Sequence, residues 1–208
     1  MAGSCCGSHK NFDGISQRYK RILLWIIAIN GIMFIVEMAA GIGAQSQALQ
    51  ADALDFLGDT LTYAISLWAI GKALEVRCKV SLVKGLSLII MAAWVFGSTL
   101  YRVFYVGEPD GYTMGGIAIA AFIANMISVL LLYRYKEGDS NVRSVWLCSR
   151  NDAIGNLVVL GAASGVWATG NAWPDLVVAF ILATLFLSSA WQILTLATAE
   201  RRSLASHG

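Results

Sequence analysis

Two short acidic motifs lie inside runs of apolar residues. Asp55 and Asp59 fall in "DALDFLGDTL", and Asp152 and Asn156 fall in "RNDAIGNL", nearly a hundred residues later. Each pair is four residues apart, which places both side chains on one face of a helix, about 6 Å apart along its axis. A charge near the centre of a bilayer costs about 3 kcal/mol or more. Carboxylates kept in such runs therefore indicate a function that needs them.

The chemistry that these residues could perform is cation binding. Three carboxylates and one amide offer oxygen ligands and a formal charge of −3 when ionised. A divalent cation would offset most of this charge, and without it mutual repulsion would hold protons on the site. The structural alternative is an aspartate paired with a buried arginine such as Arg150. The repeated spacing, with Gly58 and Gly155 at matching positions that favour close helix packing, supports the cation site.

The elements that must position these motifs are membrane-spanning helices. The chain has 208 residues, of which 57% are apolar and 13% charged, with two prolines. Apolar runs of about 20 residues, enough to cross a bilayer, occur at 22–44, 48–71, 86–106, 112–133, 145–168 and 173–199. The sequence predicts an all-α integral membrane protein with six transmembrane helices at 22–199, an N-terminal cytosolic tail at 1–21 and a short C-terminal cytosolic tail at 200–208.

Basic residues predict how the chain is oriented. Thirteen of the fifteen Lys and Arg residues fall before the first run, after the last, or in the links after the second and fourth. The positive-inside rule makes that side cytoplasmic, so both termini are expected in the cytosol. We expect a multi-pass protein of the bacterial inner membrane. The net charge of +2 follows from this asymmetry and gives no reason to expect nucleic-acid binding.

The second and fifth runs cross the membrane in opposite directions, so their motifs meet in reverse order. At about 1.5 Å per residue, Asp59 and Asp152 are expected at one depth near the midplane, and Asp55 and Asn156 at another. Four oxygen-bearing side chains would then converge. The match between the two halves predicts an inverted repeat of three helices, an architecture with its transport site at the bilayer centre.

Several other residues near these motifs are secondary candidates. Cys148 lies one turn before Asp152 and is either an accessory soft ligand or a small apolar filler. Asp52 lies one turn outward from Asp55. We expect it to be an accessory ligand or part of an exit path or proton relay, with a helix cap as the structural alternative. Glu37 and Arg150 could form a buried ion pair.

Two further signals lie near the ends of predicted elements. The segment "CCGSH" places Cys5, Cys6 and His9 in the predicted cytosolic tail. These residues either capture metal or are incidental in a disordered tail. Their spacing is not that of a closed zinc site. Asp175 follows Pro174 where the last run begins, a position at which the helix dipole favours an acid.

These residues resemble the cation diffusion facilitator family. "SQALQADALDFLGD" is similar to its second transmembrane helix and "NVRSVWLCSRNDAIGN" to its fifth. Asn30 and Glu37 in "NGIMFIVEMAAG" resemble the first helix, Asn125 the fourth and "WPDLVVAFILA" the sixth. The resemblance implies proton-coupled efflux of a divalent transition metal, with Asp55, Asp59 and Asp152 as ligands.

The sequence departs from the family pattern at three points. Asn156 stands where the family usually has Asp, none of the four site positions is His, and the usual cytosolic domain after the sixth helix is missing, which suggests a short form. Zinc, cadmium or cobalt is the expected cargo, with iron and manganese open. Expected partners are the metal ion, protons and the bilayer, with a homodimer left open. No prosthetic group is expected.

Other functions fit the sequence less well. An intramembrane aspartyl protease also uses two membrane aspartates, but residues 56–59 read "FLGD" where that family has Gly-x-Gly-Asp. We therefore expect that the protein is not an enzyme. A membrane protein that binds or senses metal without transporting it is the alternative, and a flux measurement separates the two.

Overall fold

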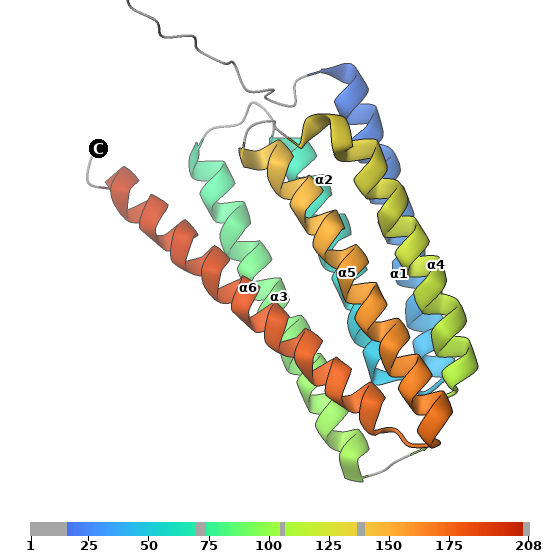
Figure 1. Ribbon diagram of the computed structural model, residues 1–208. Coiled ribbons are helices and arrows are strands. Elements are labelled where there is room, and N and C mark those ends of the chain that lie inside the picture. The colour runs from blue at the N-terminus through green and yellow to red at the C-terminus, as the bar shows by residue number, and fades with distance from the viewer. Residues whose placement is uncertain (1–15, 70–73, 105–106, 137–139, 206–208) are drawn as a thin grey trace, which may run out of the picture.

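Six long α-helices make up nearly all of the computed structural model, which describes residues 16–69, 74–104, 107–136 and 140–205 (Figure 1). The helices are α1 (Gln17–Gly43), α2 (Gln47–Ala69), α3 (Leu74–Phe104), α4 (Gly111–Leu132), α5 (Ser140–Thr169) and α6 (Trp173–Ala205), with a short 3₁₀ helix, η1 (Tyr133–Tyr135), after α4. The described ranges contain no β-strand. The predicted all-α fold is confirmed.

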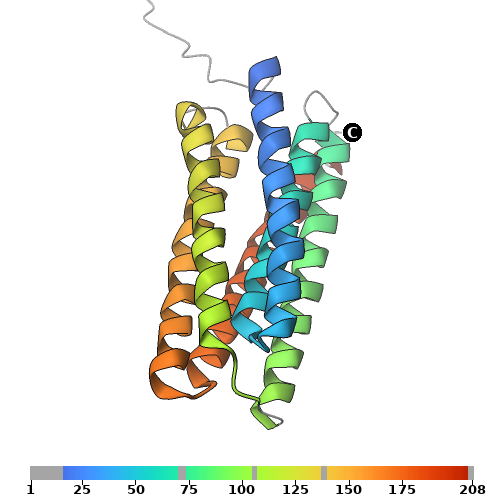
Figure 2. The same cartoon turned by 90° about the vertical axis from the view of Figure 1, so that its right-hand side faces the viewer.

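The helices divide into a group of four and a pair. α1, α2, α4 and α5 run side by side, whereas α3 and α6 pack on each other and lean away from the rest (Figures 1 and 2). α2 contacts α1, α3, α5 and α6, so it lies between the two groups. The first turn of α1 and the last turn of α6 lie at the same end of the molecule (Figure 1). We call this the inner end and the opposite end the outer end.

Four helical segments have the length and composition to cross a membrane. They are Gln17–Gly43, Gly85–Phe104, Gly111–Tyr135 and Trp173–Trp191. α2 carries three aspartates and α5 carries Arg150 and Asp152, so neither contains an apolar segment comparable to these four. The helices also extend past the predicted apolar runs, most of all α3, which begins at Leu74 instead of residue 86. Hydropathy detects the part of a helix that is apolar enough to cross the hydrocarbon core, not the part that extends beyond it.

The tight turn between α1 and α2 is held by residues from two other parts of the chain. Gln45 has a positive φ of 55°, and its carbonyl accepts a hydrogen bond from Arg102 Nη1 at the end of α3. The backbone N–H of Asp110 donates to the Ala44 carbonyl. An added Cβ at Gly41 would lie 3.0 Å from the Gln50 backbone nitrogen, so α1 and α2 approach closely here.

Asp175 of α6 caps the start of α2. Its carboxylate accepts hydrogen bonds from the backbone N–H groups of Gln47 (2.7 Å) and Ala48 (3.0 Å) and from the Ser46 hydroxyl. Ser46 Oγ in turn accepts from the Leu49 N–H, and its carbonyl accepts from the Gln50 N–H. The Ser46 N–H donates to the Gly41 carbonyl, so the N–H groups of residues 46–49, which a helix start leaves unpaired, all have partners. The sequence predicted only a favourable position at the start of α6, and the capping of another helix went undetected.

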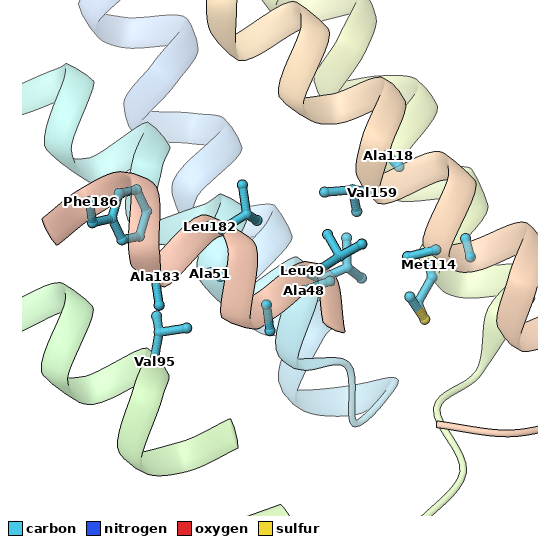
Figure 3. Close-up of a cluster of buried hydrophobic side chains, with 14 of the residues drawn as sticks. Ala48, Leu49, Ala51, Val95, Met114, Ala118, Val159, Leu182, Ala183 and Phe186 are labelled. Carbon is cyan, nitrogen blue, oxygen red and sulfur yellow. The ribbon is translucent and has the colours of Figure 1, made fainter. Parts of the chain in front are cut away.

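The buried apolar residues form two clusters, one toward each end of the bundle. The outer cluster joins α2, α3, α4, α5 and α6, and Figure 3 shows part of it, with Leu49, Val95, Met114, Val159 and Leu182 among its members. The inner cluster joins α1, α2, α4 and α5, and its buried members are Tyr19, Leu23, Ile26, Tyr63, Leu132 and Val145. Burial of these side chains stabilises both ends of the bundle.

Candidate metal centre

A layer of buried polar side chains lies between the two apolar clusters. On α2, Ala51 is the last buried member of the outer cluster and Tyr63 belongs to the inner cluster. On α5, Val159 belongs to the outer cluster and Val145 to the inner cluster. The buried and half-buried polar residues between these limits, together with those at similar positions on α1 and α4, include Asn30, Glu37, Asp52, Asp55, Asp59, Asn125, Ser128, Ser149, Asp152 and Asn156. Apolar packing therefore separates this layer from both ends of the described bundle.

The structure brings Asp55, Asp59 and Asp152 together between α2 and α5. The Asp152 side chain lies within hydrogen-bonding reach of both Asp55 and Asp59. Asp59 is 9% exposed, and the other two are half-buried. A carboxylate has no proton to donate, so each contact needs either a shared proton or a cation between the two groups. Asp152 Oδ2 is buried and receives no hydrogen bond.

These aspartates are arranged in pairs and do not form a closed cage. Within the described parts of the chain, no three His, Cys, Asp or Glu side chains meet at distances suited to a metal ion. Ionised carboxylates repel one another, and a divalent cation would remove that repulsion.

Asn156 lies one turn outward from Asp152 on α5 and is fully buried. Neither its amide oxygen nor its amide nitrogen has a hydrogen-bond partner. A buried amide without partners is costly unless a ligand or water satisfies it. The contacts described above join the three aspartates, and Asn156 adds an unpaired oxygen acceptor at the neighbouring level of the helix.

The two motif glycines do not perform the role that was predicted for them. An added Cβ at Gly155 would meet nothing within 4 Å, and one at Gly58 would make only ordinary contacts with Leu88 and Met91 of α3. Close approach of α2 and α5 therefore does not depend on either glycine. Short Asp side chains reach one another because α2 and α5 are neighbours in the bundle.

Tyr63 is a site residue that the sequence analysis missed. Its hydroxyl donates a hydrogen bond to Asp59 Oδ2, and it lies 3.3 Å from Ser149 Oγ and 3.5 Å from the Val145 carbonyl oxygen. Tyr63 is fully buried within the inner cluster. It continues the four-residue spacing of Asp55 and Asp59, and that periodicity could have identified it.

The secondary candidates differ in whether they contact Asp55, Asp59 and Asp152. Cys148 is not in a disulfide and lies close enough to Asp152 and Tyr63 for their charges to interact. Asp52 lies within hydrogen-bonding reach of Glu37. Cys5, Cys6 and His9 lie outside the described residues.

The predicted ion pair between Glu37 and Arg150 is wrong. Arg150 is exposed, donates to Asn151 Oδ1 and lies over the Trp146 ring, whereas Glu37 is fully buried between helices. The Arg150 guanidinium therefore lies on the exposed side of α5, where Asn151 and the Trp146 ring are its partners, and not in the buried layer with Glu37.

Comparison with known proteins shows that the chain is similar to membrane transporters of metal cations. The zinc transporter ZitB of Pectobacterium atrosepticum is 28% identical over 201 residues, and the metal cation efflux system protein CzcD of Cupriavidus metallidurans is 27% identical over 200; each match covers 90% of this chain and 62% of the relative. The cadmium, cobalt and zinc/H(+)-K(+) antiporter of Bacillus velezensis is 25% identical over 206 residues, with 90% of this chain and 64% of the relative covered. The chain thus spans less than two thirds of each of these relatives.

The family match extends over nearly all of the helical region. Residues 23–199 match the cation efflux transmembrane domain, from the inner part of α1 to the last turns of α6. The matched region includes both acidic motifs, Tyr63 and the cap at Asp175. The chain therefore belongs to the cation efflux transmembrane-domain family.

Proposed function

We propose that this protein exports a divalent transition-metal cation in exchange for protons. The observation that carries the proposal is the pairwise contact of Asp152 with Asp55 and with Asp59, in a polar layer that apolar packing separates from both ends of the bundle. Three carboxylates carry a formal charge of −3 when ionised, which a divalent cation offsets in large part. The names of the relatives, which refer to zinc, cadmium and cobalt, support these metals as cargo.

The exchange follows from the charge of the site. An ionised, metal-free triad between apolar clusters would be strongly destabilised, so protons replace the departing metal. An arriving metal then displaces those protons. Asp55, Asp59 and Asp152 are the proposed ligands, and Asn156 supplies a fourth oxygen that does not titrate.

Access to the site requires one apolar cluster to open while the other stays closed. The described inner cluster contains residues of α1, and the outer cluster contains residues of α3 and α6. Different helices can therefore separate at each end, which fits alternating exposure by rocking of helix groups. We place both termini in the cytoplasm of a bacterial inner membrane, because basic residues such as Arg18, Arg21 and Arg134 gather at the inner end.

The test is metal flux in proteoliposomes. Purified protein is reconstituted with a metal-sensitive dye inside, a pH gradient is imposed, and Zn²⁺, Cd²⁺, Co²⁺, Mn²⁺ and Fe²⁺ are tested in turn. We expect saturable flux of at least one metal that requires the pH gradient. Asp59→Asn and Asp152→Asn should each reduce flux to the level of empty vesicles, because each removes one of three ligand charges.

Glu108→Gln is the matched control, since it neutralises an exposed acid in the outer loop before α4. It should transport at the wild-type rate. Metal binding by the wild type without any flux would contradict transport and support the alternative of a metal-binding or sensing membrane protein. Wild-type flux in a folded Asp59→Asn or Asp152→Asn variant would remove that residue from the site.

A further inference from the structure

A second pair of buried carboxyl groups lies outward of the metal centre, between α1 and α2. Glu37 is 0% exposed and Asp52 is 3% exposed. Each side chain lies within hydrogen-bonding reach of the other, and Glu37 is close enough to Asp55 for their charges to interact. Asp52 precedes Asp55 by three residues, a displacement of about 4.5 Å along α2. The pair therefore occupies the next level of the bundle toward the outer end.

Neither carboxyl group has the partners that a buried charge needs. Apart from the two carboxyl groups themselves, no N–H or O–H group of the described residues donates to Glu37 Oε1, Glu37 Oε2 or Asp52 Oδ2. Arg150, the expected counter-ion, is exposed on α5 and bonded to Asn151. Buried acceptors without donors are rare, and each requires an explanation such as a bound ion. The pair therefore needs a positive charge between its two carboxyl groups, either a shared proton or a bound cation.

We propose that Glu37 and Asp52 form a second binding site for the divalent metal, on the exit path from Asp55 to the outer face. This proposal rests on the proposed transport function. Two carboxylates match the charge of a divalent cation, and hard oxygen ligands can hold such an ion with water in its remaining positions. A site with two protein ligands binds more weakly than the three aspartates, as a site from which the ion must leave requires.

The outward continuation of the path is marked by one more unpaired oxygen. Gln47 in the first turn of α2 is 2% exposed, and its side-chain Oε1 accepts no hydrogen bond. Its backbone N–H is fixed by Asp175, so the residue is anchored at the outer end of the helix. Asp55, Asp52 and Gln47 thus place oxygen ligands at successive levels of α2 between the metal centre and the outer end.

The proposal is tested by metal stoichiometry in lipid nanodiscs. Zn²⁺ bound at equilibrium is measured for the wild type, for the double variant Asp59→Asn/Asp152→Asn, and for that double variant with Glu37→Gln or Asp52→Asn added. We expect two equivalents in the wild type and one weaker equivalent in the double variant. Either addition should remove the remaining equivalent, whereas adding Glu108→Gln should retain it. Melting temperature and size-exclusion profile verify that each variant is folded.

Flux gives a second measurement that does not depend on the double variant. Glu37→Gln alone should lower maximal Zn²⁺ flux by about tenfold while the apparent KM changes little, because loading of the metal centre from the inner side is intact. Glu108→Gln again serves as the control.

The outcomes separate this proposal from the proposed function. If the wild type transports metal but the folded double variant binds no Zn²⁺, the exit site is refuted and transport stands. If Glu37→Gln shifts the pH dependence of flux but leaves Zn²⁺ stoichiometry unchanged, the pair holds a proton and the metal site is refuted. If the wild type neither binds nor transports any metal, the proposed function itself fails.

Discussion

Replacement of Asp175 with alanine should destabilise the protein more than any other single loss of a helix cap in the described structure. The carboxylate is 1% exposed and accepts two backbone N–H groups and one hydroxyl from the start of α2. Alanine leaves the N–H groups of Gln47 and Ala48 without a partner. Each buried unsatisfied donor costs about 1–3 kcal/mol, so we expect a loss of about 2–6 kcal/mol in the free energy of unfolding.

Asp175→Asn refines this prediction. The amide retains one acceptor oxygen but loses the charge and the second acceptor, so it can satisfy only part of the cap. We expect an intermediate loss of about 1–2 kcal/mol. A graded series in which Asn lies between Asp and Ala would show that hydrogen-bond acceptance, and not side-chain volume, stabilises the start of α2.

The assay is reversible unfolding of purified protein in mixed micelles at neutral pH, followed by circular dichroism. Asp110→Ala is the matched control, because Asp110 is an exposed cap that accepts from the Tyr112 N–H and the Thr113 hydroxyl of its own helix, α4. The Thr113 hydrogen bond lowers the pKa of the Asp110 carboxyl, so its contribution is present at neutral pH and is lost as the pH falls through the lowered value. An Asp175→Ala variant no less stable than Asp110→Ala would refute the reasoning.

Two further predictions concern the metal centre. Tyr63→Phe removes the hydroxyl that donates to Asp59, so metal flux should fall by about tenfold or more in a protein that remains folded; unchanged flux and an unchanged pH profile would show that Tyr63 only fills space. Asn156→Asp should keep metal binding but alter the pH dependence or metal preference of flux, because it adds a titratable group. Asn156→Leu should impair binding, measured with Zn²⁺ in nanodiscs, and normal transport by this variant would leave the site with three protein ligands.

The sequence predicted the helices better than their contacts. The apolar runs located all six helices because hydrophobic length is a local property. The four-residue spacing likewise placed Asp55 and Asp59 on one face of α2. Both inferences needed only the residues of a single helix.

What the sequence could not predict depends on packing between distant helices. Asp175 caps α2 from 127 to 129 residues away, and no local pattern distinguishes it from an ordinary acid at a helix start. Arg150 was expected beside Glu37 because both lie in apolar runs, but the rotation of α5 turns it outward. The choice between lipid-facing and buried sides of a helix is set by its neighbours.

The cap at the start of α2 also has a consequence for how the chain is assembled during synthesis. α2 enters the bilayer long before α6 is made, so for most of translation its first turn lacks the carboxylate that completes it. Amide groups without partners are poorly tolerated in hydrocarbon, which keeps this turn near the water interface until α6 arrives. Docking of α6 then fixes the outer end of the helix that carries Asp55 and Asp59. The binding helix is therefore locked into its final position only after α6 has been inserted.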